Sequence, residues 1–277
     1  MLITVDTGGT KTLVASFNEK GVLGEQTKFE TPKKSVEYIK LLKSTLKEKY
    51  SDKVVDAVVI ATPGIIKNGV VIWGGGNLST WKNLDIKREL TGILGKAPVF
   101  VENDANLAGL SETRFLKTIP PQSLYVTIST GIGTGITTDG HINAALRNSE
   151  AGHALVEFDG VVREWESFAS GKAIYNTYGK YARDIKNKQI WKQIADRISR
   201  GFLAVIPILQ PDIVIIGGSI GTYFDRFGDQ LQNILKEKLP PHIPCPLFVQ
   251  AKYPELAVIY GCYYYAVDNL ATKKLKK

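Results

Sequence analysis

The sequence has little of what metal-cluster, secreted and membrane proteins need. Its 277 residues include two cysteines, Cys245 and Cys262, and these are too far apart to form the C-x-x-C pairs of zinc clusters. No run of about 18 apolar residues suggests a membrane-spanning helix. The N-terminus lacks the basic and apolar regions of a signal peptide. We therefore expect a cytoplasmic protein with no membrane partner.

The charge balance is basic without indicating a nucleic-acid partner. Lys and Arg number 35 and Asp and Glu 27, which gives a formal net charge of +8. Half of this excess comes from a terminal tail with lysines at 273, 274, 276 and 277. Further lysines in residues 33–53 have the spacing of a helix face in water. A solvated face and a basic tail explain the charge, although a basic surface can also bind nucleic acid.

The order of apolar segments predicts an α/β protein made of two related halves. Residues 2–6 and 12–17 read as a hairpin around Thr7-Gly8-Gly9-Thr10, and residues 124–129 and 134–138 repeat this pattern around Thr130-Gly131-Ile132-Gly133. Alternating strands and helices follow each hairpin, which indicates an internal duplication. We expect further strands at 54–61, 98–101, 213–216 and 247–251, and helices at 34–50, 104–116, 187–206, 223–238 and 255–269.

Three glycine segments are candidates for binding phosphate or nucleotide. Glycine lets backbone N–H groups approach a phosphate, while threonine and lysine add a hydroxyl and a charge. The segment at 129–135 matches neither a Walker nor a dinucleotide motif, and a plain glycine hairpin is the alternative for the segment at 6–11. The carboxylate of Asp6 is also a candidate ligand for Mg²⁺. The candidate residues are Asp6, Gly8, Gly9, Thr10 and Lys11, then Thr130, Gly131, Gly133 and Thr134, and finally Gly217, Gly218 and Ser219 for adenosine.

The segment Glu102-Asn103-Asp104-Ala105-Asn106 lies where a predicted strand ends and a helix begins. Ligands bind at this edge of open α/β sheets. Asp104 can accept a proton there, or it can merely cap the helix. The amide of Asn103 can both donate to and accept from sugar hydroxyls.

Glu150, His153 and Glu166 form a second set of polar candidates. Carboxylates and an imidazole suit a ligand with a ring of hydroxyl groups. A purely structural histidine is the alternative at position 153, and it is the expected role of His141 and His242. A zinc ion at His153 is not expected, because no cysteine lies near it in the sequence.

Together these segments resemble the ROK family of sugar kinases and related sugar-responsive repressors, from residue 2 to about residue 266. Residues 6–11 and 129–135 look like the two phosphate loops of the family. Residues 102–106 resemble its catalytic segment, in which the aspartate is the base. Residues 150–153 match its E-x-G-H motif, and residues 166–171 match the end of its C-L-E-x-x-A-S-G segment, whose glutamate touches the sugar. Residues 62–64 and 74–78 look like its sugar-side loops, which adds Gly64, Gly76 and Asn77 to the candidates.

The resemblance implies an actin-like, ribonuclease-H-like duplicated fold with two lobes and a central cleft that closes on the sugar. We expect one lobe at 1–116, joined by the helix at 255–270, a second lobe at 117–254, and a homodimer. The implied reaction transfers the terminal phosphoryl group of ATP, with Mg²⁺, to the primary hydroxyl of a hexose, with glucose preferred. Asp104 would take the hydroxyl proton, and the residues fixing the sugar ring would be Asn103, Glu150, His153 and Glu166.

One departure from the family leaves alternatives open. Many members carry a zinc-binding C-x-C-G-x-x-G-C cluster, whereas residues 159–165 contain no cysteine, so we expect no zinc site. This feature also resembles the zinc-free polyphosphate glucokinases, which makes polyphosphate an alternative donor. Fructose is an alternative acceptor. N-acetylmannosamine and N-acetylglucosamine are further alternatives, since Gly76 leaves space for an acyl group. A sugar-sensing regulator is the non-enzyme alternative, although the first strand begins too early for a helix-turn-helix module before it.

Overall fold

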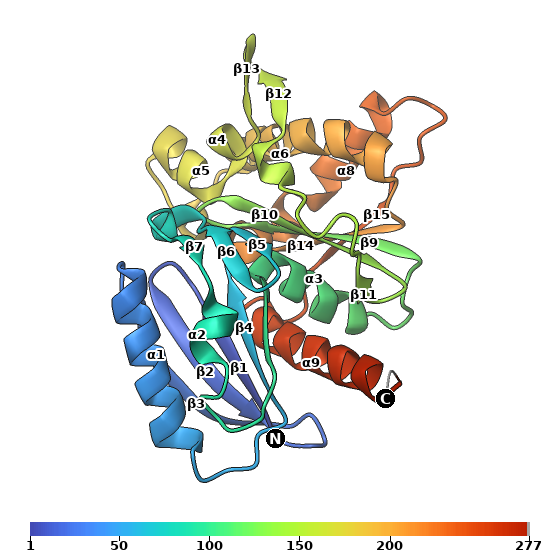
Figure 1. The fold of residues 1–277 in the computed structure, drawn as a ribbon. Coiled ribbons are helices and arrows are strands. Elements are labelled where there is room, and N and C mark those ends of the chain that lie inside the picture. Colours follow the sequence, from blue (N-terminus) through green and yellow to red (C-terminus); the bar gives the residue numbers. More distant parts are fainter. Residues whose placement is uncertain (276–277) are drawn as a thin grey trace. The chain divides into compact units, whose positions relative to one another are not determined.

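The computed structural model describes residues 1–275, which divide into two compact units (Figure 1). Unit 1 comprises residues 1–111 and the C-terminal segment from residue 256, and unit 2 comprises residues 112–255. The last two lysines of the predicted basic tail, Lys276 and Lys277, lie outside the described residues. Within the described part, no helix combines the length and the apolar character needed to cross a membrane.

Unit 1 is built on a five-stranded sheet in the order β3-β2-β1-β4-β8. The first hairpin forms as predicted, with β1 (Leu2–Thr7) antiparallel to β2 (Lys11–Phe17), and β3 (Leu23–Glu30) extends it. On the other side of β1, the strands β4 (Ala57–Thr62) and β8 (Val99–Asn103) run parallel to it. The sequence analysis did not predict β3, whose residues are mostly exposed and polar.

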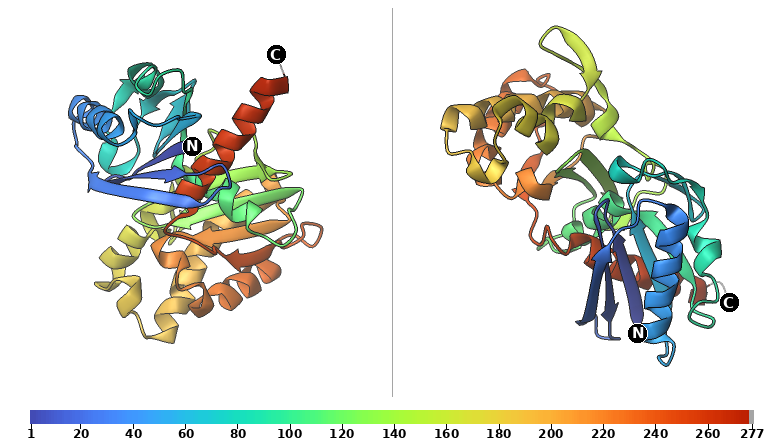
Figure 2. Two further views of the ribbon diagram at one scale, coloured as in Figure 1. Left: turned by 90° about the horizontal axis from the view of Figure 1, so that it is seen from below. Right: turned by 90° about the vertical axis from the view of Figure 1, so that its left-hand side faces the viewer.

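Different helices cover the two faces of this sheet. Side chains alternate between the faces along each strand, so each strand supplies apolar residues to both. One face buries Ile3, Val5 and Ile60 against α1 (Ser35–Tyr50). On the other face α9 (Ala257–Leu275) packs over β1 and β4, where the alanines at 57 and 61 are fully buried. Figures 1 and 2 show α1 and α9 on opposite sides of the sheet. The helix α3 (Asp104–Arg114) meets α9 at Gly261, where a Cβ atom would lie 1.9 Å from the carbonyl of Leu107.

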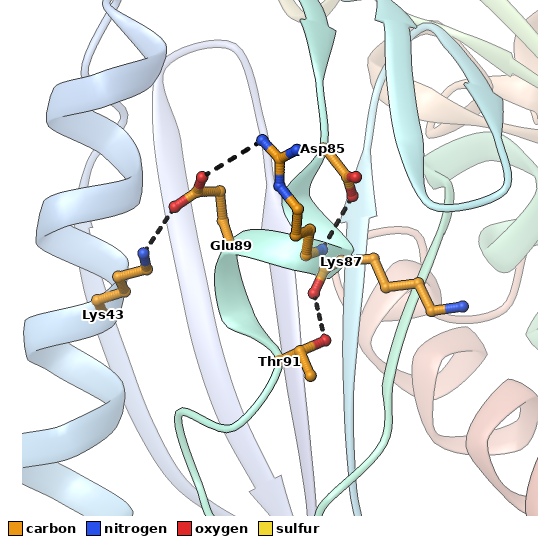
Figure 3. A network of polar contacts seen from close by, with 6 residues as sticks. Lys43, Asp85, Lys87, Glu89 and Thr91 are labelled. Carbon is orange, nitrogen blue, oxygen red and sulfur yellow. Dashed lines mark hydrogen bonds and ion pairs between the residues drawn. The ribbon is translucent and has the colours of Figure 1, made fainter.

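Smaller elements complete unit 1 between β4 and β8. The strands β5 (Ile65–Lys67), β6 (Val70–Trp73) and β7 (Lys82–Leu84) form a three-stranded sheet, with η1 (Gly76–Leu78) between β6 and β7. The short helix α2 (Ile86–Leu90) follows, with Asp85 as its N-cap. Figure 3 shows how α2 is tied to α1 by an ion pair of 2.7 Å between Lys43 Nζ and Glu89 Oε2.

Unit 2 repeats the sheet of unit 1, in the order β11-β10-β9-β14-β15. The strand β9 (Gln122–Ile128) is antiparallel to β10 (Ile132–Thr138), which pairs with β11 (His141–Ile142). The strands β14 (Ile213–Gly217) and β15 (Leu247–Gln250) are parallel to β9. Both sheets therefore have two antiparallel and then two parallel pairings in the same order, which confirms the predicted duplication.

The helices of unit 2 pack on its sheet through one apolar cluster, which includes Val126, Ile198, Phe202, Val214 and Leu231. The long helix is α6 (Lys188–Leu209), and α8 (Gly228–Lys238) lies beside it. Shorter elements are η2 (Ala151–His153), α4 (Glu166–Ala169), α5 (Gly171–Tyr178), η3 (Ala182–Asp184), α7 (Gly218–Gly221) and η4 (Phe224–Arg226). A hairpin of β12 (Leu155–Phe158) and β13 (Val161–Glu164) projects from this unit (Figure 1).

Candidate active site

The candidate residues of unit 1 gather at the carboxyl ends of its three parallel strands. The register aligns Asp6 of β1 with Ala61 of β4, and Ala61 with Glu102 of β8. Asp104 follows one residue after β8, at the first position of α3. Because parallel strands end at one edge of the sheet, segments almost 100 residues apart in the sequence meet there.

Asp6 and Asp104 interact electrostatically at this edge. Burial and, second to it, the nearby negative charge of Asp104 together raise the pKa of Asp6 from 3.8 to about 7. Burial also raises the pKa of Asp104, against the opposing effect of backbone N–H groups. Two carboxylates placed so close together favour a cation beside them. Their oxygen atoms are the donors that Mg²⁺ prefers, so the residues present fit this ion.

The N-cap of α3 is Asn103, and this bears on the alternative in which Asp104 only caps the helix. Asn103 Oδ1 accepts hydrogen bonds from the backbone N–H groups of Ala105 at 2.9 Å and Asn106 at 3.1 Å. These are the two positions that an N-cap side chain ordinarily serves. Asp104 Oδ1 accepts from the Ala105 N–H at 2.8 Å, which is one of the two N–H groups that Asn103 already serves. The helix therefore has its cap without Asp104, and the other carboxylate oxygen has no part in these capping bonds.

Asn103 is itself held on both sides of its amide. Its Nδ2 donates to the carbonyl of Gly64 at 3.0 Å, while its Oδ1 serves the cap. One Nδ2 hydrogen is therefore left for a ligand. Gly64 has φ of +97°, and a Cβ atom there would lie 2.1 Å from the Trp73 carbonyl. Only glycine fits this position, so the backbone that holds Asn103 depends on it.

Glu102 and Asn106 support the segment, and the sequence analysis gave them no role. Glu102 Oε1 accepts from the Asn103 backbone N–H and from Asn106 Nδ2, both at 3.0 Å. Both side chains are almost fully buried. Glu102 lies in β8 and Asn106 in the first turn of α3, so their hydrogen bond joins the strand end to the helix start. A carboxylate followed four residues later by asparagine across this junction was the available signal.

The first glycine segment forms a tight turn between β1 and β2. The Gly8 N–H donates to the Lys11 carbonyl at 3.0 Å, and the Thr31 hydroxyl donates to the Gly8 carbonyl at 2.8 Å. Thr10 and Lys11 are exposed. A Cβ atom on Gly9 would lie 3.0 Å from that of Asn77, so this turn touches a predicted sugar-side loop. Gly76 has φ of +54° and open space around it.

In unit 2, Ser129 connects three segments that are far apart in the sequence. Its carbonyl accepts from the Gly171 N–H at 2.6 Å, and its hydroxyl accepts from the Ser219 N–H at 3.1 Å. Gly218 has φ of +80°, and a Cβ atom there would clash with Ile128 and Ser129. The second and third glycine segments, which the sequence analysis assigned to donor binding, are therefore neighbours.

Glu166 and Thr134 tie the second glycine segment to the other polar candidates of unit 2. Glu166 Oε2 accepts from the Ile132 N–H at 3.0 Å, and a Cβ atom on Gly131 would lie 2.6 Å from that oxygen. The Thr134 hydroxyl accepts from the Ala151 N–H at 3.4 Å, and its side chain is 5% exposed. Thr130, Gly131 and Gly133 retain some exposure.

His153 lies among carboxylates. Its Nδ1 is 3.2 Å from Glu164 Oε2. Partial burial by itself would lower the pKa of His153, but the hydrogen bond with Glu164 and the charges of Glu166 and Glu150 outweigh it and raise the pKa. Ligand atoms of His153, Glu164 and Glu166 lie within 4.8 Å of one another, close enough to share a metal ion. The expectation that the chain binds no zinc stays a prediction.

Comparison with known proteins decides the family. The pattern of the ROK family matches residues 2–268. The chain belongs to the ROK family. This ROK protein is 30% identical to the glucokinase of Thermotoga maritima over 292 residues, which cover 90% of this chain and 89% of that protein.

Solved structures show the same fold. A ROK family glucokinase from Streptomyces griseus, in complex with glucose and AMPPNP, matches with a TM-score of 0.79 at 21% identity, covering 96% of this chain and 99% of that one. The inorganic polyphosphate/ATP-glucomannokinase from Arthrobacter sp. strain KM matches with a TM-score of 0.71 at 28% identity, covering 97% and 98%. The predicted actin-like, duplicated α/β fold is thereby confirmed, and the family is one of sugar kinases.

Proposed function

We propose that this ROK protein is a hexose kinase that transfers the terminal phosphoryl group of ATP to the primary hydroxyl of glucose. The observation that carries the proposal is the position of Asp104. It stands at the carboxyl ends of the three parallel strands of the sheet, beside a second carboxylate, at a helix that Asn103 already caps. A structural role leaves that carboxylate unexplained, whereas a role as the base that receives a hydroxyl proton accounts for it.

The raised pKa of Asp104 suits this task. A base works best when its pKa approaches the working pH, and burial moves Asp104 in that direction. Phosphoryl transfer has a loose transition state, so alignment and charge neutralisation contribute most of the rate enhancement. Asp104 would orient the sugar hydroxyl and take its proton as the new P–O bond forms.

Asp6 would hold Mg²⁺ in unit 1, directly or through water. The ion, when bound, neutralises charge on the donor phosphates. Asp6 would be a ligand of the ion. Burial and Asp104 raise the pKa of its carboxyl, and a bound cation would favour the ionised form. The exposed residues of the same turn, Thr10 and Lys11, and the N–H groups of Gly8 and Gly9 would contact phosphate oxygens.

Unit 2 would contribute nucleotide and sugar contacts. Its backbone at Thr130, Gly131 and Gly133, and at Gly217, Gly218 and Ser219, would contact the nucleotide. Glu150, His153 and Glu166 would bind sugar hydroxyls, as Gly64, Gly76, Asn77 and Asn103 would in unit 1.

We propose that units 1 and 2 are the two lobes of the kinase and that the kinase is a homodimer. Light scattering that gives the mass of a single chain would contradict the dimer.

Polyphosphate is a second candidate donor. The relative that favours it is the glucomannokinase from Arthrobacter, whose name includes both polyphosphate and ATP and which matches over nearly the full chain. The contact between the second and third glycine segments at Ser129 supports ATP, because neighbouring segments would bind the phosphates and the adenosine of one nucleotide.

The test combines a substrate panel with one variant. Glucose, mannose, fructose and the two N-acetylated amino sugars are each offered with ATP and with polyphosphate. Asp104→Asn should bind sugar normally in calorimetry and lose turnover by about 10²–10⁴-fold. Asp85→Asn is the matched control, because asparagine also caps a helix, and it should keep full turnover. Near-normal turnover of Asp104→Asn would contradict the assignment, and sugar binding without any turnover in the wild type would favour the regulator.

A further inference from the structure

The β12–β13 hairpin brings His153 and Glu164 together through its register. Leu155 pairs with Glu164, and the Trp165 N–H continues the ladder by donating to the Ala154 carbonyl at 2.9 Å. His153 ends η2 two residues before Leu155, and its Nδ1 lies 3.2 Å from Glu164 Oε2. The turn residue Asp159 and the glycine after it have φ of +55° and +75°, as a two-residue hairpin turn requires.

The base of the hairpin is firmly anchored. Trp165, between the two glutamates at 164 and 166, is fully buried, and its ring lies so close to Gly201 of α6 that a Cβ atom there would be 1.9 Å away. The Phe158 ring stacks on the Phe168 ring with 4.4 Å between their centroids, and the Arg197 guanidinium lies 4.8 Å from the centroid of Phe158. The backbone that carries Glu164 is therefore fixed by packing, although the Glu164 side chain itself is 49% exposed.

The contact between His153 and Glu164 determines which nitrogen of the imidazole carries the proton. An ionised carboxylate can only accept, so Nδ1 must carry the proton in the 3.2 Å contact. When the ring is neutral, Nε2 is then an unprotonated acceptor on the opposite edge. Free histidine prefers the other tautomer, with the proton on Nε2. The partner of one ring nitrogen thus decides what the other can do.

We propose that Glu164 is a positioning residue for His153: it fixes the ring and its Nδ1–H tautomer, so that Nε2 receives a hydrogen bond from a sugar hydroxyl. The proposal rests on the proposed sugar kinase function. Glu164 does not touch the sugar in this arrangement and acts only through the imidazole. Glu166, whose Oε2 accepts from the Ile132 N–H, lies close to the same imidazole.

Three variants and two measurements test the role. Glu164→Ala removes the acceptor, Glu164→Gln keeps an oxygen that can accept from Nδ1, and Glu157→Gln is a matched control. Glu157 lies on the same hairpin, where its Oε1 accepts from the Gly160 N–H at the turn. Nitrogen-15 NMR, above the pH at which imidazoles are protonated, reports the tautomer. The chain has three histidines, so a His153→Gln spectrum assigns the signal.

We expect the Nδ1–H tautomer in the wild type, in Glu164→Gln and in Glu157→Gln, and its loss in Glu164→Ala. KM for glucose should rise roughly 10-fold in Glu164→Ala with little change in kcat, and Glu164→Gln should restore most of it. An Nε2–H tautomer in the wild type, or an unchanged tautomer and KM in Glu164→Ala, would overturn the proposal. So would a loss of glucose affinity after chelation that one equivalent of Zn²⁺ restores, because Glu164 would then be a metal ligand.

The two measurements also separate this inference from the proposed function. NMR reads the tautomer whether or not the protein phosphorylates a sugar. If no sugar in the panel is phosphorylated but the tautomer depends on Glu164, the kinase assignment fails and the positioning contact stands. If all three variants phosphorylate glucose with the KM of the wild type, the positioning role of Glu164 is wrong and the kinase assignment stands. Should Glu164→Ala not fold by circular dichroism, the wild-type and Glu164→Gln spectra still decide the tautomer.

Discussion

Replacing Asp6 by asparagine should stabilise the protein at neutral and alkaline pH. The folded protein holds the Asp6 carboxyl at a pKa of about 7, against 3.8 for the ordinary side chain, because of burial and the neighbouring Asp104. Between those two values the folded chain binds more protons at this site than the unfolded chain. The free energy of unfolding must therefore fall as pH rises from about 4 to 7, and stay lowered above that.

The size of this effect follows from the shift. At about 1.4 kcal/mol per pKa unit, a rise from 3.8 to about 7 corresponds to about 4 kcal/mol. Asp6 keeps some contact with water, so we take roughly half, ~2 kcal/mol, as the expected gain in Asp6→Asn at pH 8. For a chain of this size that is a rise of roughly 5 °C in the midpoint of thermal unfolding.

Thermal unfolding followed by circular dichroism from pH 4 to pH 9, in EDTA, is the assay. The wild type and Asp6→Asn should coincide near pH 4, where both side chains are neutral, and diverge toward pH 8. Asp52→Asn, which removes an exposed aspartate of unit 1, should follow the wild type throughout. Added Mg²⁺ should stabilise the wild type more than Asp6→Asn at pH 8. A variant that is less stable at pH 8, or a difference independent of pH, would refute the reasoning.

Other predictions concern glycines and the helix cap. Gly201→Ala should cost about 2–3 kcal/mol of unfolding free energy in urea titrations, because its Cβ would overlap the fully buried Trp165 ring; a loss below about 0.5 kcal/mol would contradict the packing. Asn103→Ala should cost about 1–2 kcal/mol through loss of the α3 cap, and Asn103→Ser should recover part of it. Gly131→Ala should displace the Glu166 carboxylate and raise KM for glucose roughly 10-fold at unchanged thermal stability, whereas a normal KM would separate Glu166 from the sugar.

Much of the fold was predictable because its signals are local. The glycine turn between two apolar runs predicts a hairpin, and repetition of that pattern at residues 124–138 predicts the duplicated sheets that the structure shows. Buried parallel strands such as β4 are continuous apolar runs, which a sequence displays directly. The edge strand β3 was not predicted, since exposed polar residues form it through pairing with β2. The hairpin turn at Asp159-Gly160 was also overlooked, although aspartate followed by glycine is a strong turn signal.

The sequence by itself determined which residues are candidates, and the tertiary structure decided how they are placed. Asp104 was a carboxylate at a strand end that could equally be a cap; only the structure assigns the cap to Asn103 and brings Asp104 near enough to Asp6 to raise the pKa of Asp6. Likewise the sequence shows Glu164 two residues before Glu166, but only the folded chain brings Glu164 Oε2 to 3.2 Å from His153 Nδ1. The physical reason is that backbone turns depend on neighbours in sequence, whereas charges and hydrogen bonds depend on neighbours in space.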